Sequence, residues 1–136
     1  MHSLIDRLAS ALSDIPGIRL AVLFGSMARG TTTPGSDVDV GILFAADSTD
    51  ARRLAGAALG RAVMRDLDVV SLEEASPHLR FEIARDGRPL FQADPHVWSE
   101  FRARAMLDWW DWAPTARKIH TAAAQRLRSQ IVHGPS

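Results

Sequence analysis

Three aspartates are the residues whose spacing could support metal-dependent chemistry. Asp37 and Asp39 lie in the stretch "SDVDV" with one residue between them, and Asp68 lies in a second apolar stretch, "LDVVS". Alternate side chains of a strand share one face, roughly 6.6 Å apart, so Asp37 and Asp39 should project together while Val38 and Val40 enter the core. Two carboxylates on one face repel each other unless a cation or water lies between them. A hard cation such as Mg²⁺ is the natural solution.

The contribution of Asp68 depends on how the strands pair. If its strand lies beside the strand that holds Asp39, Asp68 can line up with both other aspartates. Three carboxylates on adjacent strands can hold two metal ions about 3.5–4 Å apart. Asp66 lies two residues earlier and would share the face of Asp68, so either can be the third carboxylate. We favour Asp68 because the apolar strand begins around it.

A glycine–serine turn provides a second functional element. Gly25, four residues and Gly30 form the frame of a P-loop, which should continue with lysine, but Thr31 follows here. The turn comes after an expected strand and begins a helix, whose first N–H groups are free to bind an anion. Gly25 lets the backbone approach a phosphate closely, the Ser26 hydroxyl can donate a hydrogen bond, and Arg29 can add a charge-assisted contact. We expect metal ions and this turn to replace the missing lysine.

Helices and short strands alternate along the chain. The patterns predict helices over 3–14, 26–29, 50–64 and 77–86, one or two helices over 95–129, and strands over 18–24, 38–44, 67–71 and 89–91, the last at an edge. This mix indicates an α/β or α+β fold with one small sheet and helices against it. We expect a single domain, with a core over 1–94, a helical extension over 95–129 packed on it, and a tail over 130–136.

The extension carries a continuous apolar stripe, which predicts packing against the core. Pro114 should kink or divide it. Trp110 and Met106 fall off the stripe, so they could be exposed and contribute to a partner interface. The stripe runs through Trp98, Phe101, Ala105, Trp109, Trp112, Ala116 and Ile119.

Composition excludes several classes of function. Lys plus Arg and Asp plus Glu both number 16, so the formal net charge is zero, which disfavours direct nucleic-acid binding. The chain has no cysteine, which excludes disulfides and thiolate zinc sites, and its five histidines lack ligand spacing. No apolar run reaches membrane-spanning length and no signal peptide is evident, so we expect a cytoplasmic protein without a membrane partner.

The stretch "GSMARGTTTPGSDVDVGIL" resembles the minimal nucleotidyltransferase (MNT) antitoxins of the DNA polymerase β-like nucleotidyltransferase superfamily. Their pattern has Gly-Ser, ten residues and Asp-x-Asp. The resemblance implies the polymerase β-like fold, ATP as substrate and the use of two Mg²⁺ ions. It assigns Asp37, Asp39 and Asp68 as catalytic metal ligands.

The same resemblance assigns Gly25 and Ser26 to the nucleotide-binding turn, and we expect Arg29 and Ser36, which lie in the same stretch, to bind the nucleotide with them. It also implies a partner, a HEPN-family ribonuclease toxin, which MNT antitoxins silence by transferring AMP to a tyrosine hydroxyl. Two other functions stay open: neutralisation of the toxin by binding alone, and nucleotidyl transfer to a small molecule, which would normally need a further domain.

Overall fold

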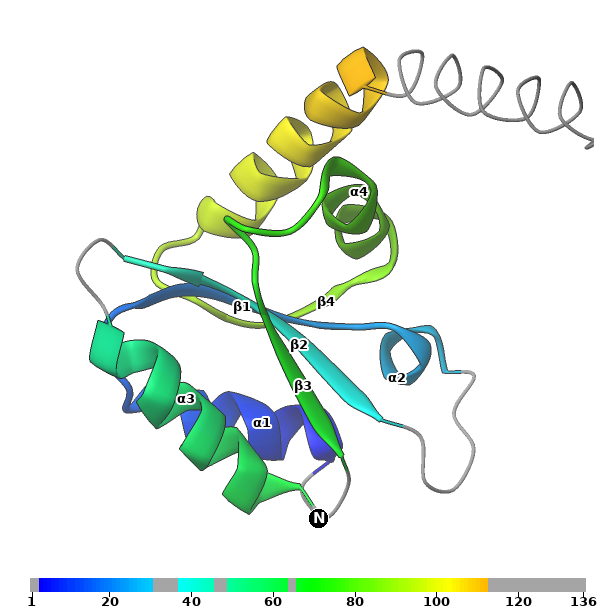
Figure 1. The fold of residues 1–136 in the computed structure, drawn as a ribbon. Helices are drawn as coiled ribbons and strands as arrows, with labels where there is room; N and C mark the ends of the chain where they lie inside the picture. Colours follow the sequence, from blue (N-terminus) through cyan, green and yellow to red (C-terminus); the bar gives the residue numbers. More distant parts are fainter. Residues whose placement is uncertain (1–2, 31–36, 46–48, 64–65, 113–136) are drawn as a thin grey trace, which may run out of the picture.

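The computed structural model describes residues 3–30, 37–45, 49–63 and 66–112. Its strands form a four-stranded mixed sheet with helices on both faces (Figure 1). This arrangement confirms the predicted fold class. In chain order the elements are α1 (Leu4–Ser13), β1 (Ile18–Phe24), α2 (Ser26–Arg29), β2 (Val38–Phe44), α3 (Thr49–Ala62), β3 (Leu67–Ser71), α4 (Pro77–Asp86) and β4 (Arg88–Gln92).

The strand order in the sheet is β3-β2-β1-β4. β1 pairs antiparallel with both β2 and β4, whereas β2 and β3 run parallel. Parallel neighbours need a crossover connection, and α3 provides it. The expected position of β4 at an edge is confirmed, and β3 lies beside β2, which is the condition for Asp68 to line up with Asp39.

Two apolar layers lie on opposite faces of the sheet. Alternate residues of β2, from Val38 to Phe44, pack with α1 and α3 on one face. Leu20 and Val22 of β1 pack with α4 and with a helix over 97–112 on the other face. Figure 1 shows these two layers below and above the sheet. The period-two alternation of the strands therefore decides which face each side chain occupies.

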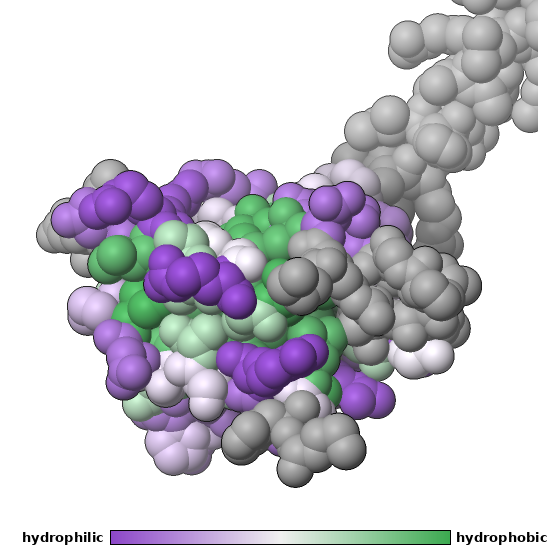
Figure 2. Space-filling model, turned by 90° about the horizontal axis from the view of Figure 1, so that it is seen from below, coloured by the Kyte–Doolittle hydropathy of each residue, from purple (hydrophilic) through white to green (hydrophobic). Residues whose placement is uncertain are grey.

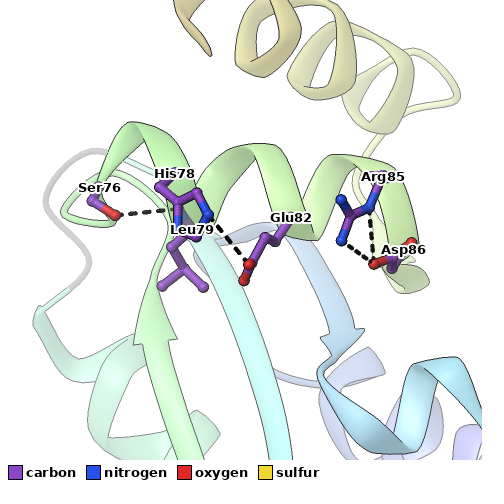
Figure 3. Close-up of polar contacts among 6 residues, drawn as sticks. All are labelled: Ser76, His78, Leu79, Glu82, Arg85 and Asp86. Carbon is purple, nitrogen blue, oxygen red and sulfur yellow. Dashed lines mark hydrogen bonds and ion pairs between the residues drawn. The ribbon is translucent and has the colours of Figure 1, made fainter. Parts of the chain in front are cut away.

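Local capping explains where the helices begin. The Ser3 hydroxyl accepts a hydrogen bond from the Asp6 N–H at 3.1 Å, and the Ser76 hydroxyl accepts one from the Leu79 N–H at 3.2 Å (Figure 3). Such bonds satisfy N–H groups that have no partner inside the helix. Gly87 ends α4, and its N–H donates a hydrogen bond to the Ile83 carbonyl at 2.8 Å.

The helix over 97–112 buries Phe101 and Ala105 against α4 and the sheet. Trp109 stacks on Phe81 of α4 with ring centroids 5.1 Å apart. Trp110 is 67% exposed, as its place off the stripe suggested. The expectation for Met106 is wrong, because Met106 is partly buried against this core layer. The helix begins at residue 97 rather than 95, and the predicted effect of Pro114, the segment 113–129 and the tail lie outside the described residues.

Candidate functional site at the start of β2 and β3

Asp39 and Asp68 lie side by side at one end of the sheet. In the parallel pairing of β2 with β3, Asp39 is in register with Asp68. Their strand neighbours Val38, Val40 and Leu67 pack toward α1 and α3, so both carboxylates belong to the opposite face. Phe24, the last residue of β1, is the partner of Asp39 on its other side. The sheet therefore places two carboxylates together where β1 ends.

Asp37 and Asp66 flank this pair. Asp37 is exposed and directly precedes β2. Asp66 is also exposed, and its backbone carbonyl accepts a hydrogen bond from the Val38 N–H at 2.8 Å. Asp66 thus helps to start the parallel pairing through its backbone, while Asp68 is the residue in register with Asp39. This geometry favours Asp68 over Asp66 as the third carboxylate.

The charges of this site act on one another. Burial raises the pKa of the Asp39 carboxyl above its ordinary value, and the negative charges of Asp68 and Asp37 raise it further. The Arg29 guanidinium lowers the same pKa, but less strongly. Ionised Asp39 is therefore a carboxylate whose charge the folded chain compensates incompletely.

Gly25 lies directly against the Asp39 carboxylate. Its φ of 75° and ψ of −153° belong to a region that only glycine adopts readily. A Cβ atom built at Gly25 would lie 2.5 Å from Asp39 Oδ2. The contact follows from the sheet, because Gly25 succeeds Phe24, the register partner of Asp39. The glycine turn and the acidic pair thus form one continuous site.

The predicted nucleotide-binding residues Ser26 and Arg29 form the two ends of α2. This helix is a single turn, so a phosphate there would be held by individual N–H groups and the Ser26 hydroxyl rather than by a large helix dipole. Arg29 is exposed. Ser36, the remaining predicted nucleotide-binding residue, lies outside the described residues.

Asp86 is a neighbour of the site that the sequence did not suggest. It ends α4, where Arg85 donates hydrogen bonds to Asp86 Oδ2 at 2.8 and 3.1 Å (Figure 3). The bond from Arg85 lowers the pKa of the Asp86 carboxyl, and Arg29 adds to this lowering. Arg29 therefore acts on two carboxylates, Asp39 and Asp86, which come from different elements. No local pattern marks Asp86, since only the packing of α4 brings it near α2.

The donor atoms suit a hard cation, since carboxylate oxygens are the ligands that Mg²⁺ prefers. The unrelieved negative charge around Asp39 points the same way. Within the described ranges, no three Asp, Glu or His side chains are already arranged closely enough to hold a metal ion. Binding of such a cation would therefore depend on the Asp39–Asp68 pair, with Asp37 next to the pair at the start of β2.

A separate open groove of about 560 Å³ lies between α1 and α3, on the other face of the sheet. Figure 2 views the molecule from that side and shows hydrophilic side chains interspersed with apolar ones. None of the predicted site residues lines the groove. Its lining residues are Asp6, Arg7, Ser10, Ala11, Asp14, Ala58, Arg61 and Ala62. Among the described helices, none is both long and apolar enough to cross a membrane.

Comparisons with known proteins agree with this geometry. The chain is 38% identical over 80 residues to the protein adenylyltransferase MntA of Shewanella oneidensis, and the match spans 57% of each protein. The chain thus matches little more than half the length of this curated relative. A chain from a toxin–antitoxin complex solved with AMP-PNP superposes with a TM-score of 0.74 at 26% identity, covering 88% of this chain and 98% of that one.

A second solved structure supports the same fold. It contains a tri-AMPylated HEPN toxin of Shewanella oneidensis with an MNT antitoxin, and the matching chain has a TM-score of 0.69 at 24% identity, with 89% and 96% coverage. These findings confirm the resemblance to MNT antitoxins. The family described as polymerase beta, nucleotidyltransferase, matches residues 6–96, which include the glycine turn and the three aspartates. The chain therefore belongs to the polymerase β nucleotidyltransferase family.

Proposed function

We propose that this protein is an antitoxin that transfers AMP from ATP to a hydroxyl of a HEPN-family ribonuclease toxin, with a tyrosine as acceptor and Mg²⁺ as the required ion. The observation that carries the proposal is the register of Asp39 with Asp68 beside the Gly25 turn. Three further findings support it: the family, the adenylyltransferase activity named for MntA, and the AMPylated toxin in a similar complex.

Each part of the site has a role in this transfer. Asp39 and Asp68, with Asp37 beside them, would hold Mg²⁺, which when bound neutralises phosphate charge and lowers the pKa of an attacking hydroxyl. The N–H groups of the turn and the Ser26 hydroxyl would bind phosphate oxygens, and Arg29 would add a charged contact. Catalysis then consists mainly of positioning and charge neutralisation.

The bond changes in the transfer are simple. The acceptor hydroxyl loses its proton to solvent, and its oxygen forms a bond to the α-phosphorus of ATP. The bond from that phosphorus to the oxygen bridging to the β-phosphorus breaks, and pyrophosphate leaves. The site at the end of the sheet is open, because Asp37 and Asp68 are exposed. A protein acceptor can therefore approach and complete it.

Labelling of a HEPN toxin from the same genome tests the proposal. The toxin is incubated with the chain, Mg²⁺ and ATP labelled at the α-phosphate. We expect label on the toxin with the unchanged chain and with Glu73→Gln, an exposed acidic residue just beyond β3. We expect none with Asp39→Asn. Undiminished labelling by Asp39→Asn would refute the metal-binding role of Asp39. Loss of labelling with Glu73→Gln would show that the active site lies elsewhere.

A second candidate function is neutralisation by binding alone. Three large apolar residues near the end of the 97–112 helix favour it: Leu107 is 55% exposed, Trp110 67% and Trp112 38%. Exposed aromatic side chains are typical of protein interfaces. Intact-mass spectrometry of the co-expressed toxin separates the two functions. A mass increase of one or more AMP units means transfer, whereas an unmodified toxin held in a complex means binding.

A further inference from the structure

Gly25 has a positive φ, which side chains rarely allow, and the Asp39 side chain lies close to it. A Cβ atom built at Gly25 would point at Asp39. Its distances to the Oδ2, Cγ and Cβ atoms of Asp39 would be 2.5, 3.4 and 3.7 Å. The missing side chain therefore leaves room for the Asp39 carboxylate. This differs from the role expected from the sequence, in which the missing side chain leaves room for a phosphate.

We propose that Gly25 is a positioning residue for the metal site: the absence of its side chain is what allows the Asp39 carboxylate to occupy its place between the glycine turn and Asp68. The inference rests on the proposed function, since it assigns Gly25 a role in the binding of the cation. Asp39 has a short side chain held by the backbone of β2, and its register with Asp68 is set by the sheet. A methyl group at position 25 would meet the carboxylate at a distance that real Cβ atoms do not tolerate.

The carboxylate would yield first in such a clash. It is the end of a side chain, whereas Gly25 belongs to the backbone between β1 and α2. Gly25, which follows β1, and Asp68 of β3 flank Asp39 on the two sides of β2, so a displaced Asp39 carboxylate would change its position relative to Asp68 and the geometry with which the pair meets a cation. The predicted consequence is weaker binding of a divalent cation in a chain that still folds.

Gly30 offers a matched control. It lies at the other end of α2 with a φ of 73°, and a Cβ built there has no atom of the described residues within 4 Å, its chain neighbours aside. Gly30→Ala therefore also adds a methyl group at a positive φ, without a clash. It separates the effect of the contact with Asp39 from that of a methyl group at a positive φ, and the double variant Gly25→Ala/Asp39→Ala controls for the different ψ of Gly25, −153° against 16° at Gly30.

Mn²⁺ is a suitable probe, because it prefers the same oxygen ligands as Mg²⁺ and free Mn²⁺ is measured directly by electron paramagnetic resonance. We expect Gly30→Ala to bind Mn²⁺ like the unchanged chain and Gly25→Ala to bind it at least about tenfold more weakly, as for residues that orient metal ligands. The double variant Gly25→Ala/Asp39→Ala should bind no more weakly than Asp39→Ala alone. Unchanged Mn²⁺ binding by Gly25→Ala, or losses that multiply in the double variant, would overturn the inference.

Two further outcomes are informative. If Gly25→Ala weakens only the binding of an ATP analogue and not that of Mn²⁺, the glycine serves the phosphate and the inference is wrong. If Gly25→Ala does not fold, thermal unfolding decides: the double variant Gly25→Ala/Asp39→Ala should fold, and failure of both variants would overturn the inference. An unchanged chain that binds no Mn²⁺ would instead refute the proposed metal site itself.

Discussion

Neutralising Asp39 should stabilise the folded chain while abolishing its activity. The pKa of the Asp39 carboxyl is raised above the ordinary value of 3.8, first by burial and then by Asp68 and Asp37. Below pH 3.8 the carboxyl is neutral in both the folded and the unfolded chain, so its charge has no effect on stability. As the pH rises through the folded-state pKa, the charge increasingly opposes folding. Asp39→Asn removes this opposition at pH 7.

The expected gain is small but measurable. Asp39 and Asp68 are directly opposite each other in the sheet, and like charges in that position destabilise by roughly 0.2–1 kcal/mol. Asp68 is exposed, so solvent screening places the gain near the middle of that range, at about 0.5 kcal/mol. For a chain of this length such a gain raises the melting temperature by about 2 °C.

Thermal unfolding with a metal chelator present measures this effect. Asp39→Asn should melt above the unchanged chain at pH 7, and the difference should vanish below pH 3.8 and shrink at high salt. Asp66→Asn is the control, because Asp66 is exposed and outside the register pair, and it should not change the melting temperature. A lower melting temperature for Asp39→Asn at pH 7, or a gain of equal size at both pH values, would refute the reasoning.

Other predictions concern the third carboxylate, a helix cap and the C-terminal helix. Asp68→Asn should reduce AMP transfer by about 10²-fold or more while Asp66→Asn retains it; the reverse result in a rate assay would assign the role to Asp66. Ser76→Ala should lower the free energy of unfolding by about 1 kcal/mol without changing transfer, and unchanged stability would show that the cap of α4 is dispensable. Phe101→Ala should lower that free energy by about 3–5 kcal/mol. Trp110→Ala, at an exposed position, should change it by no more than about 0.5 kcal/mol yet weaken toxin binding in a titration, and full binding would exclude this surface from the interface.

The elements around the site could be predicted from the sequence because their signals are local. The apolar run before Gly25 defines β1 with the same bounds in sequence and structure, Ile18–Phe24. For α4, Ser76 caps the helix, Pro77 begins it and Gly87 ends it. Each signal depends on residues that are neighbours in the chain, through backbone conformation, capping or alternation of faces. Spacing within one stretch likewise indicates Asp37, Asp39 and the glycine turn, whereas Asp68 lies in a separate stretch.

The tertiary structure alone decided how these parts meet. The preference for Asp68 over Asp66 depends on the parallel register of β2 with β3. A shift of that register by one residue would move every side chain of β3 to the other face of the sheet. The contact of Gly25 with Asp39 depends on the antiparallel pairing of β1 with β2, and the influence of Arg29 on Asp86 depends on the packing of α4. Spacing along one chain segment cannot specify these relations, because pairing and packing join residues that are distant in sequence and are selected by the burial of the whole sheet.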